Sequence, residues 1–408
     1  MTDKEQGASR AHSQSGVTRI AELFWTALRL GLTSFGGPVA HLGYFREEYV
    51  SNRKWLEEDE YVDLVALCQF LPGPASSQVG IGVGIRRAGL LGGFVAWLGF
   101  TMPSAIALIA FAYGVSHIGD VAGAGWLHGL KVVAVAVVAY AVWGMARNLA
   151  PDKRRMTIAA AGAVTLLFWQ SAYAQLAVIA AGGLIGWQLI PRGSTMSGGH
   201  GMPIGKRLGI AALVTFFGLL IALPIAAGIA DNRALDVFKS FYQSGSLVFG
   251  GGHVVLPLLQ SQVVPPGWVT NDQFIAGYGA AQAVPGPLFT FSSYLGATID
   301  FMPTRWLGGL FALGAIYVPS FLLVTGALPF WSRLRSFTGF QRAMAGVNAA
   351  VVGLLLAALY NPVWTSAILG PRDFALGVAA FVLLAWWKVP PWLVVVLAAL
   401  GGEAVSRI

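Results

Sequence analysis

Charged side chains are scarce in this sequence. Asp, Glu, Lys and Arg make up 11% of the 408 residues and 56% are hydrophobic, whereas charged residues are about a quarter of an ordinary soluble domain. This shortage excludes a soluble domain and predicts a chain that crosses the lipid bilayer several times. The net charge of +8 comes from basic residues clustered between apolar segments, so we expect no nucleic-acid partner.

Cysteine is nearly absent, and nucleotide-binding motifs are missing altogether. Cys68 is the only cysteine, which excludes an internal disulfide and a multi-thiolate metal site. The chain has no Gly-x-x-x-x-Gly-Lys-Ser/Thr loop, so ATP is not the energy source within it. It also lacks the paired carboxylates or the His–Ser arrangement that a membrane-embedded phosphatase would need. We therefore expect no cofactor, no metal and no enzymatic activity.

A Pro-Gly-Pro triplet interrupts two of the apolar stretches, at 72–74 and 285–287. Such a triplet cannot lie inside a regular helix, because proline removes a hydrogen-bond donor and clashes with the preceding turn. Non-helical backbone at membrane depth survives only where it is buried in protein or lines a watery cavity. The triplets therefore predict broken or re-entrant helices that face each other.

The fold class predicted is an all-α polytopic membrane protein with about thirteen transmembrane segments. A Gly/Ser-rich stretch at 192–206 is the clearest linker. The organisation predicted is a cytoplasmic N-terminal tail (1–18), a first repeat (19–191), a linker with a connecting helix (192–236) and a second repeat (237–408).

The two repeats are indicated by unusual residues that recur at nearly constant spacing. Phe-Gly-Gly occurs at 35–37 and 249–251, Pro-Gly-Pro recurs 285 − 72 = 213 residues later, and Pro-Ser occurs at 103–104 and 319–320. The offsets drift by a few residues, as insertions in loops would produce. Recurrence at this period indicates internal symmetry.

The orientation of the repeats follows from the basic loops, which face the cytoplasm. Arg86 and Arg87, 147–155 and 192–207 are basic, whereas 117–125 and 298–303 are not. This places an odd number of spans before the second repeat, so the repeats have inverted topology. The N-terminus is expected in the cytoplasm and the C-terminus in the periplasm. Inverted repeats with broken helices at matching positions are typical of secondary transporters.

The motifs at these positions resemble a known family. Ser-Phe-Gly-Gly-Pro-x-Ala-His at 34–41 with Gln-x-x-Pro-Gly-Pro at 69–74, and 249–253 with 282–287, are similar to the two domains of long bacterial chromate transporters. The resemblance spans Glu22 to about Pro362. It implies a multi-pass protein of the bacterial inner membrane that exports chromate, driven by the proton motive force, and confers chromate resistance. Sulfate or another oxyanion, moved by uptake or exchange, is the alternative. A channel and a phosphatase-type enzyme are further rivals.

A tetrahedral dianion needs hydrogen-bond donors, and helix N-termini and glycine-rich turns supply them from the backbone. The residues expected to form the substrate site are Gly36, Gly37, Gln69, Pro72, Gly73, Pro74, Ser76, Ser77, Gly251, Gly252, Gln282, Pro285, Gly286, Pro287 and Thr290. Pro74 and Pro287 are expected to open half-helices toward the site. The alternative is that proline and glycine only kink packed helices.

Lys131 lies in an apolar run, where a charge is costly and usually functional, and its repeat partner is Asn348. Both are added to the substrate-binding set. The alternative is that Lys131 snorkels from the outer end of its helix.

Proton coupling needs titratable groups, and histidine changes charge nearest to neutral pH. His41 and His253 follow the Gly-Gly turns and are the first candidates, with interfacial capping as the alternative. Glu22 and Asp63 lie near apolar spans and are weaker candidates. Arg29 is a further cation that either faces the bundle or pairs with Glu22. Glycine-rich surfaces would also support a homodimer, although nothing in the sequence requires one.

Overall fold

The computed structural model describes residues 16–35, 37–117, 125–169, 171–191, 204–334 and 337–406. The regular elements within these residues are all helices, which confirms the all-α prediction. Gly36, most of the N-terminal tail and most of the Gly/Ser-rich linker lie outside the described residues.

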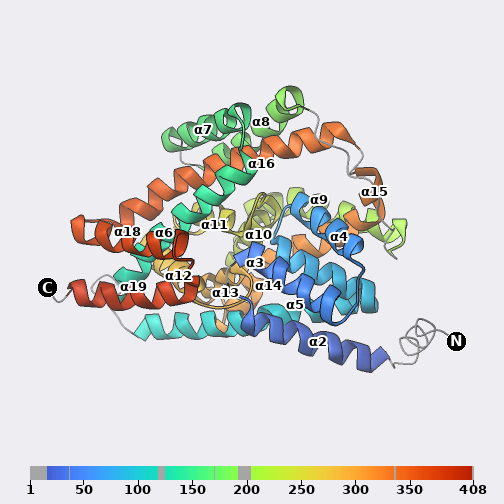
Figure 1. Ribbon diagram of the computed structural model, residues 1–408, viewed down its shortest axis with the longest axis horizontal. Helices are drawn as coiled ribbons and strands as arrows, with labels where there is room; N and C mark the ends of the chain where they lie inside the picture. Colours follow the sequence, from blue (N-terminus) through green and yellow to red (C-terminus); the bar gives the residue numbers. More distant parts are fainter. Residues whose placement is uncertain are drawn as a thin grey trace.

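The elements of the first half precede the connecting helix α9 (Lys206–Ile229) and those of the second half follow it (Figure 1). The first half comprises α2 (Gly16–Thr33), α3 (Gly37–Arg46), the π-helical η1 (Glu47–Asn52), α4 (Glu58–Phe70), α5 (Ala75–His117), α6 (Gly125–Leu149), α7 (Lys153–Phe168) and α8 (Ala172–Leu189). The second half comprises α10 (Arg233–Leu247), η2 (Gly252–Val254), α11 (Val255–Val263), α12 (Asn271–Ala281), η3 (Leu288–Thr290), α13 (Phe291–Thr298), α14 (Arg305–Ala327), η4 (Leu328–Phe330), α15 (Trp331–Leu334), α16 (Thr338–Ala358), η5 (Leu359–Trp364), α17 (Thr365–Ala367), α18 (Pro371–Ala385) and α19 (Pro391–Ser406).

Several helices are long and apolar enough to cross a bilayer, which confirms a polytopic membrane protein. Within the described residues, five meet this criterion: Ala75–Val115, Gly125–Leu149, Lys206–Ile229, Arg305–Phe330 and Thr338–Ala367. Tyr173–Leu189 and Pro391–Ser406 are shorter apolar helices. The full number of spans stays a prediction.

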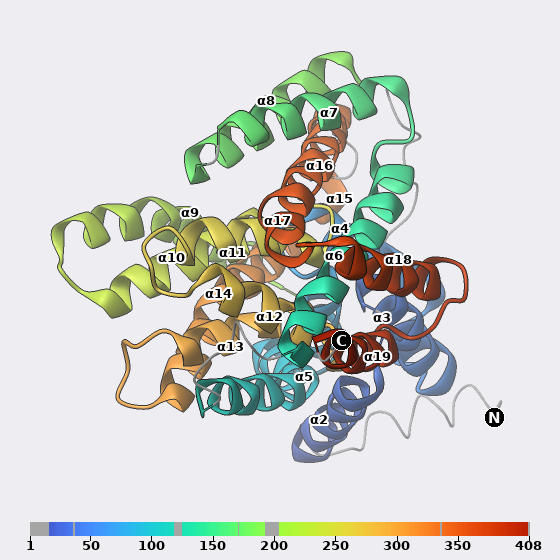
Figure 2. The ribbon, with the colours of Figure 1, turned by 90° about the vertical axis from the view of Figure 1, so that its left-hand side faces the viewer.

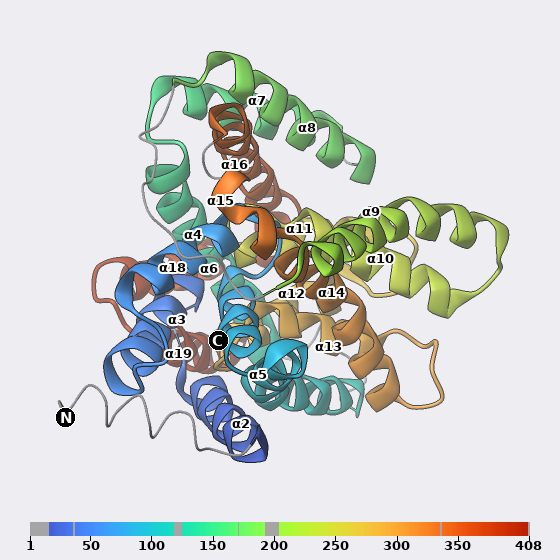
Figure 3. The same ribbon diagram turned by 90° about the vertical axis from the view of Figure 1, so that its right-hand side faces the viewer.

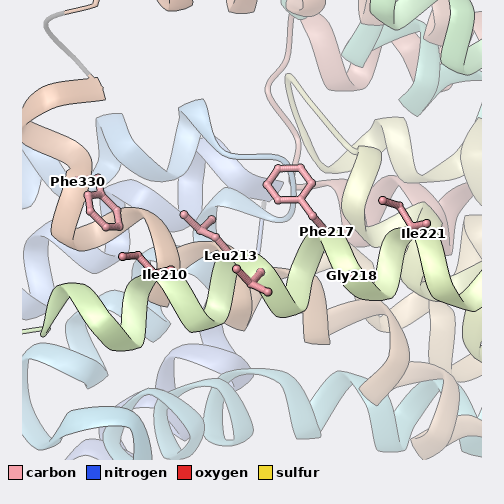
Figure 4. A pocket seen from close by; sticks show the side chains of 7 residues that line it. Ile210, Leu213, Phe217, Gly218, Ile221 and Phe330 are labelled. Carbon is pink, nitrogen blue, oxygen red and sulfur yellow. The ribbon is translucent and has the colours of Figure 1, made fainter.

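Helix α9 lies on the outside of the bundle, beside α10 and α14 (Figure 3). Its side chains Val214, Phe217 and Ile221 are exposed. Together with Phe330 they line a groove made wholly of apolar residues and a glycine (Figure 4). Burying a charged oxyanion there without donors would be very costly, so this groove suits lipid acyl chains and not the substrate.

The first Pro-Gly-Pro triplet forms the tip of a helical hairpin. Arg86, near the end of the first part of α5, donates to the Glu60 carboxylate near the start of α4. A side chain at Gly82 would collide with Leu64, so the two helices also touch along their length. Gly89 has a φ of +66°, and this break separates residues 75–87 from the spanning part of α5 at 90–117. The chain therefore enters and leaves on one side.

The second triplet forms a hairpin of the same kind. The Tyr294 hydroxyl on α13 donates to the Gln273 carbonyl near the start of α12, at 3.0 Å. The apolar stretches around both triplets, for which the sequence predicted broken or re-entrant helices, are thus helical hairpins. The arms of these hairpins are too short to span the membrane. The 13 residues of α4 rise only about 20 Å at ~1.5 Å each, which is less than the thickness of a bilayer core, about 30 Å.

The two halves exchange helices with each other. Helices α7 and α8 of the first half pack on α16, and α18 and α19 of the second half pack on α6 (Figure 2). Helix α2 packs on α5 in the same way as α10 packs on α14. Reciprocal contacts of this kind are the mark of a two-fold relation, and they agree with the predicted repeats.

Glycines at matched positions let the exchanged helices approach closely. A Cβ at Gly346 on α16 would lie 2.0 Å from the Gly182 carbonyl oxygen on α8. Its repeat partner Gly129 on α6 meets the Ala398 carbonyl oxygen on α19 at 2.2 Å. The hydrophobic effect does not drive helices together inside a bilayer, so membrane helices associate through close van der Waals contact of their backbones at small residues.

The inverted orientation of the two halves stays a prediction, because it depends on which of α7, α8 and α10 cross the bilayer in addition to the five long apolar helices.

The substitution Gly346→Ala tests the close approach of α16 and α8. The added methyl group has to displace backbone on α8, so we expect a loss of stability of roughly 1–3 kcal/mol, measured by denaturant titration of the purified protein in detergent. Gly314→Ala on α14 is the control, because a Cβ there meets nothing within 4 Å. Equal stability of the two variants would contradict the packing described.

Candidate functional site

The two hairpin tips are bonded to opposite halves of the molecule. The Gly73 amide donates to the Val248 carbonyl at 2.6 Å, and the Gly286 amide donates to the Ser34 carbonyl at 2.9 Å. Ser34 and Val248 are themselves equivalent, since each directly precedes a Phe-Gly-Gly turn. The structure therefore brings both triplets together with the ends of α2 and α10.

Glycine is required at both tips. Gly73 has a φ of +126° and Gly286 a φ of +94°, backbone conformations that other residues adopt only at a cost. A Cβ at Gly73 would lie 2.4 Å from the Gln78 side-chain nitrogen. The Gln78 amide in turn donates to the Pro72 carbonyl at 2.7 Å and holds the turn.

Hydroxyl groups and one histidine surround the first tip. Ser76 Oγ lies 3.3 Å from His41 Nδ1, and His41 Nε2 lies 3.1 Å from the Ser34 carbonyl oxygen. Ser77 Oγ lies 3.3 Å from the Tyr317 hydroxyl on α14. These five side chains are buried, so both halves contribute to one enclosed polar cluster.

Helix α5 begins inside this cluster, directly after Pro74. The first amides of a helix have no partner within it, and the helix dipole adds partial positive charge there. Backbone amides and neutral hydroxyls at such a point can bind an anion without a fixed cation. Pro74, Ser76 and Ser77 are placed as the sequence analysis expected.

Two buried hydroxyls near the meeting point of the two tips have no hydrogen-bond partner within the described residues. They belong to Ser34, at the end of α2, and to Ser320 on α14, and both side chains are fully buried. A Cβ on Gly73 would lie 2.9 Å from Ser320 Oγ. The sequence analysis did not select either serine, although the recurrence of Pro-Ser at 103–104 and 319–320 was a usable signal for Ser320.

The second tip has fewer available donors. The Thr290 hydroxyl donates to the Pro287 carbonyl at 2.7 Å. Ser104, the equivalent of Ser320, lies against Gly286 and donates to the Thr101 carbonyl at 3.1 Å. Thus both hydroxyls are already used within the fold.

The remaining residues of the predicted site lie at varied places. Gly37 begins α3, Gly251 directly precedes η2 and Gly252 begins it. Gln69 is exposed at the end of α4, whereas Gln282 has a buried side-chain nitrogen without a partner in the described part of the chain. His253 Nδ1 lies 2.9 Å from the Tyr278 hydroxyl on α12.

Lys131 is not at the tips. Its ammonium group lies 3.1 Å from the carboxylate of Asp272, at the start of α12 and thus at the base of the second hairpin. This position fits the alternative of a lysine near a helix end better than a place beside the triplets. Asn348 has a buried side-chain oxygen with no partner among the described residues.

Arg29 pairs with Glu48 and not with Glu22, so the pairing considered for it was wrong. Seven residues along α2 separate the two positions by about 10 Å, which puts them at different depths. Glu22 instead bonds to Arg53 and Arg87, each at 2.7 Å. These two bonds hold the Glu22 carboxylate between η1 and the first part of α5.

These five residues form a charge cluster that joins α2, η1 and α5 at the base of the first hairpin: Glu22, Arg29, Glu48, Arg53 and Arg87. Asp63, the other acidic candidate, accepts a hydrogen bond from Trp331 at 2.9 Å. The acidic candidates thus lie along the hairpin and its base, away from the tip.

Comparison with known proteins points to one family. A family model described as chromate transporter matches residues 21–187 and 235–403. A chromate transport protein of Pseudomonas aeruginosa is 27% identical over 403 residues, covering 93% of this chain and 90% of that protein. A probable chromate transport protein of Synechococcus elongatus is 26% identical, covering 92% and 93%. No solved structure matches the chain.

The charge cluster makes a prediction about pH. Burial raises the pKa of Glu48, but hydrogen bonding to Arg53 and the charge of Arg29 outweigh burial and leave the pKa below its usual range. A lowered pKa contributes stability above the unfolded value of about 4.3, and that contribution is lost as pH falls through the folded value. We expect Glu48→Gln to lower the melting temperature at pH 7 and the gap to wild type to shrink below about pH 4. A gap independent of pH would contradict this role.

Proposed function

Because the chain belongs to the chromate transporter family, we propose that it transports chromate across the bacterial inner membrane and exports it from the cytoplasm. The single observation that supports this most is the meeting of both hairpin tips in a buried cluster of neutral donors. Transport in this direction, driven by the proton motive force, would confer chromate resistance.

The chemistry of the tip suits a tetrahedral oxyanion. Hydroxyls of Ser76 and Ser77 and the N-terminus of α5 are donors that lose little solvation energy when buried, because they carry no net charge. An arginine at this place would bind a dianion more tightly and release it more slowly. Weak, preorganised binding is what a carrier needs, since the substrate has to leave on the other side.

Alternating access would use the exchanged helices. The first half holds α18 and α19 on α6, and the second half holds α7 and α8 on α16, so each half moves as a body that includes helices of the other. Rocking of inverted repeats about a site between them is the general mode of such transporters. The N-terminus would then lie in the cytoplasm and the C-terminus in the periplasm.

His41 is the residue that we propose to carry the coupling proton. Its two ring nitrogens bond to the Ser34 carbonyl and the Ser76 hydroxyl, both at the first tip. A change in its charge therefore acts directly on the donors around the anion. Sulfate as the substrate, moved by uptake or exchange, is the second candidate, because sulfate presents the same tetrahedron of acceptors.

Everted membrane vesicles test the function. We expect vesicles with the protein to accumulate labelled chromate faster than vesicles without it, and an interior-acid gradient to increase the uptake. If the gradient slows uptake, the proton and the anion move together and the protein is an importer. If chromate does not accumulate but labelled sulfate does, sulfate is the substrate.

The variant His41→Gln tests the coupling in the same vesicles. We expect chromate uptake that no longer responds to the pH gradient, because glutamine keeps hydrogen bonds but cannot be protonated. His128→Gln is the matched control, since His128 bonds to Asp373 between α6 and α18, in another part of the structure. A gradient response that persists in His41→Gln would remove His41 from the coupling.

A further inference from the structure

The two hairpin tips share a backbone but differ in polarity. Ser34 of the first half corresponds to Val248, at an offset of 248 − 34 = 214. Ser76 corresponds to Phe289, at the offset of 213 that relates the triplets. Ser76 at the first tip thus carries a hydroxyl where the second tip carries an aromatic side chain. Ser34 and Val248 each bond to the tip of the other half, so Ser34 meets the second tip and Val248 the first.

The hydroxyls that meet the two tips also differ in what they bond to. Ser320 and Ser104 are equivalent, and each lies against the glycine of one triplet. Ser104 donates to the Thr101 carbonyl, whereas Ser320 is fully buried with no partner within the described residues. Buried hydroxyls are rarely left unpaired, because the lost bond to water is costly.

A second unpaired hydroxyl lies between the two tips. Ser34 Oγ is fully buried and also lacks a partner in the part of the chain that the structure describes. Its carbonyl accepts from Gly286 of the second tip and lies beside His41, which bonds to Ser76 of the first tip. Ser320 is therefore the unpaired hydroxyl that lies against the glycine of the first tip.

The side-chain nitrogen of Gln282, just before the second triplet, is buried without a partner among the described residues, but the start of α13 offers no unpaired hydroxyl there. It is preceded by the 3₁₀ turn η3, and the Thr290 hydroxyl at that turn is spent on the Pro287 carbonyl. The equivalent of Thr290 is Ser77, whose hydroxyl has the Tyr317 hydroxyl as its one partner among the described residues. In such a pair one of the two hydroxyls keeps its hydrogen for a further acceptor.

We propose that the protein binds its oxyanion at one place, the tip of the first hairpin. The ligands are the hydroxyls of Ser77 and Ser320 and the amides that open α5. The second tip is a structural copy that holds the fold together. This assignment rests on the proposed function and narrows it to a single site built by both halves, with an oxyanion such as chromate or sulfate as the ligand.

The equivalent serines form a matched pair of variants. Chromate and sulfate binding to purified wild type, Ser320→Ala and Ser104→Ala is measured by calorimetry in detergent. A hydrogen bond to a charged ligand is worth about tenfold or more in affinity. We expect Ser320→Ala to weaken binding by about that factor and Ser104→Ala to change it by less than about twofold.

Further variants keep the test decisive. Ser77→Ala reports on the first tip if Ser320→Ala fails to fold, and its equivalent Thr290→Val reports on the second tip. Equal losses at both tips, or a loss only in Ser104→Ala and Thr290→Val, would overturn the single-site assignment while leaving oxyanion transport intact. If the wild type bound neither chromate nor sulfate, the proposed function would fail together with the site.

Discussion

The structure depends on one reciprocal pair of hydrogen bonds, from the Gly73 amide to Val248 and from the Gly286 amide to Ser34. Each bond ties the tip of one hairpin to the end of the first helix of the other half. Only glycine adopts the tip conformation at low cost, and the flanking prolines end the helices there. The exchanged helices and the close glycine contacts hold the halves in the register that these bonds require.

Neutral hydrogen-bond donors surround the hairpin tips, whereas the charged side chains are paired with each other at the bases of the hairpins. Arg29 and Arg53 are compensated by Glu48, and Lys131 is compensated by Asp272. No fixed cation is therefore among the groups that surround the first tip in the described residues. Neutral dipoles offset only part of the desolvation energy of a bound anion, so the anion binds weakly and the barrier to its release stays low.

Sequence alone predicted the features that depend on local chemistry. Proline and glycine at 72–74 and 285–287 predict broken helices, and the recurrence of this triplet indicates the internal repeat. The return of α5 alongside α4 was not predictable, because it depends on contacts such as Arg86 with Glu60. Ser320 was missed for a similar reason, since only the packing of α14 brings it to Gly73. Lys131 was selected because a charge in an apolar run is costly. The sequence could not show that Asp272 compensates this charge, because Asp272 is distant in sequence and only the fold brings it to Lys131.

The position of the bound anion tests the central claim most directly. A structure of the protein crystallised with chromate, with diffraction collected at the chromium absorption edge, would locate the metal atom of the anion. We expect one anomalous peak within hydrogen-bonding reach of the Ser77 and Ser320 hydroxyls, beside the start of α5. A peak beside Ser104 and Thr290 at the second tip, or beside Lys131, would contradict a single site at the first hairpin.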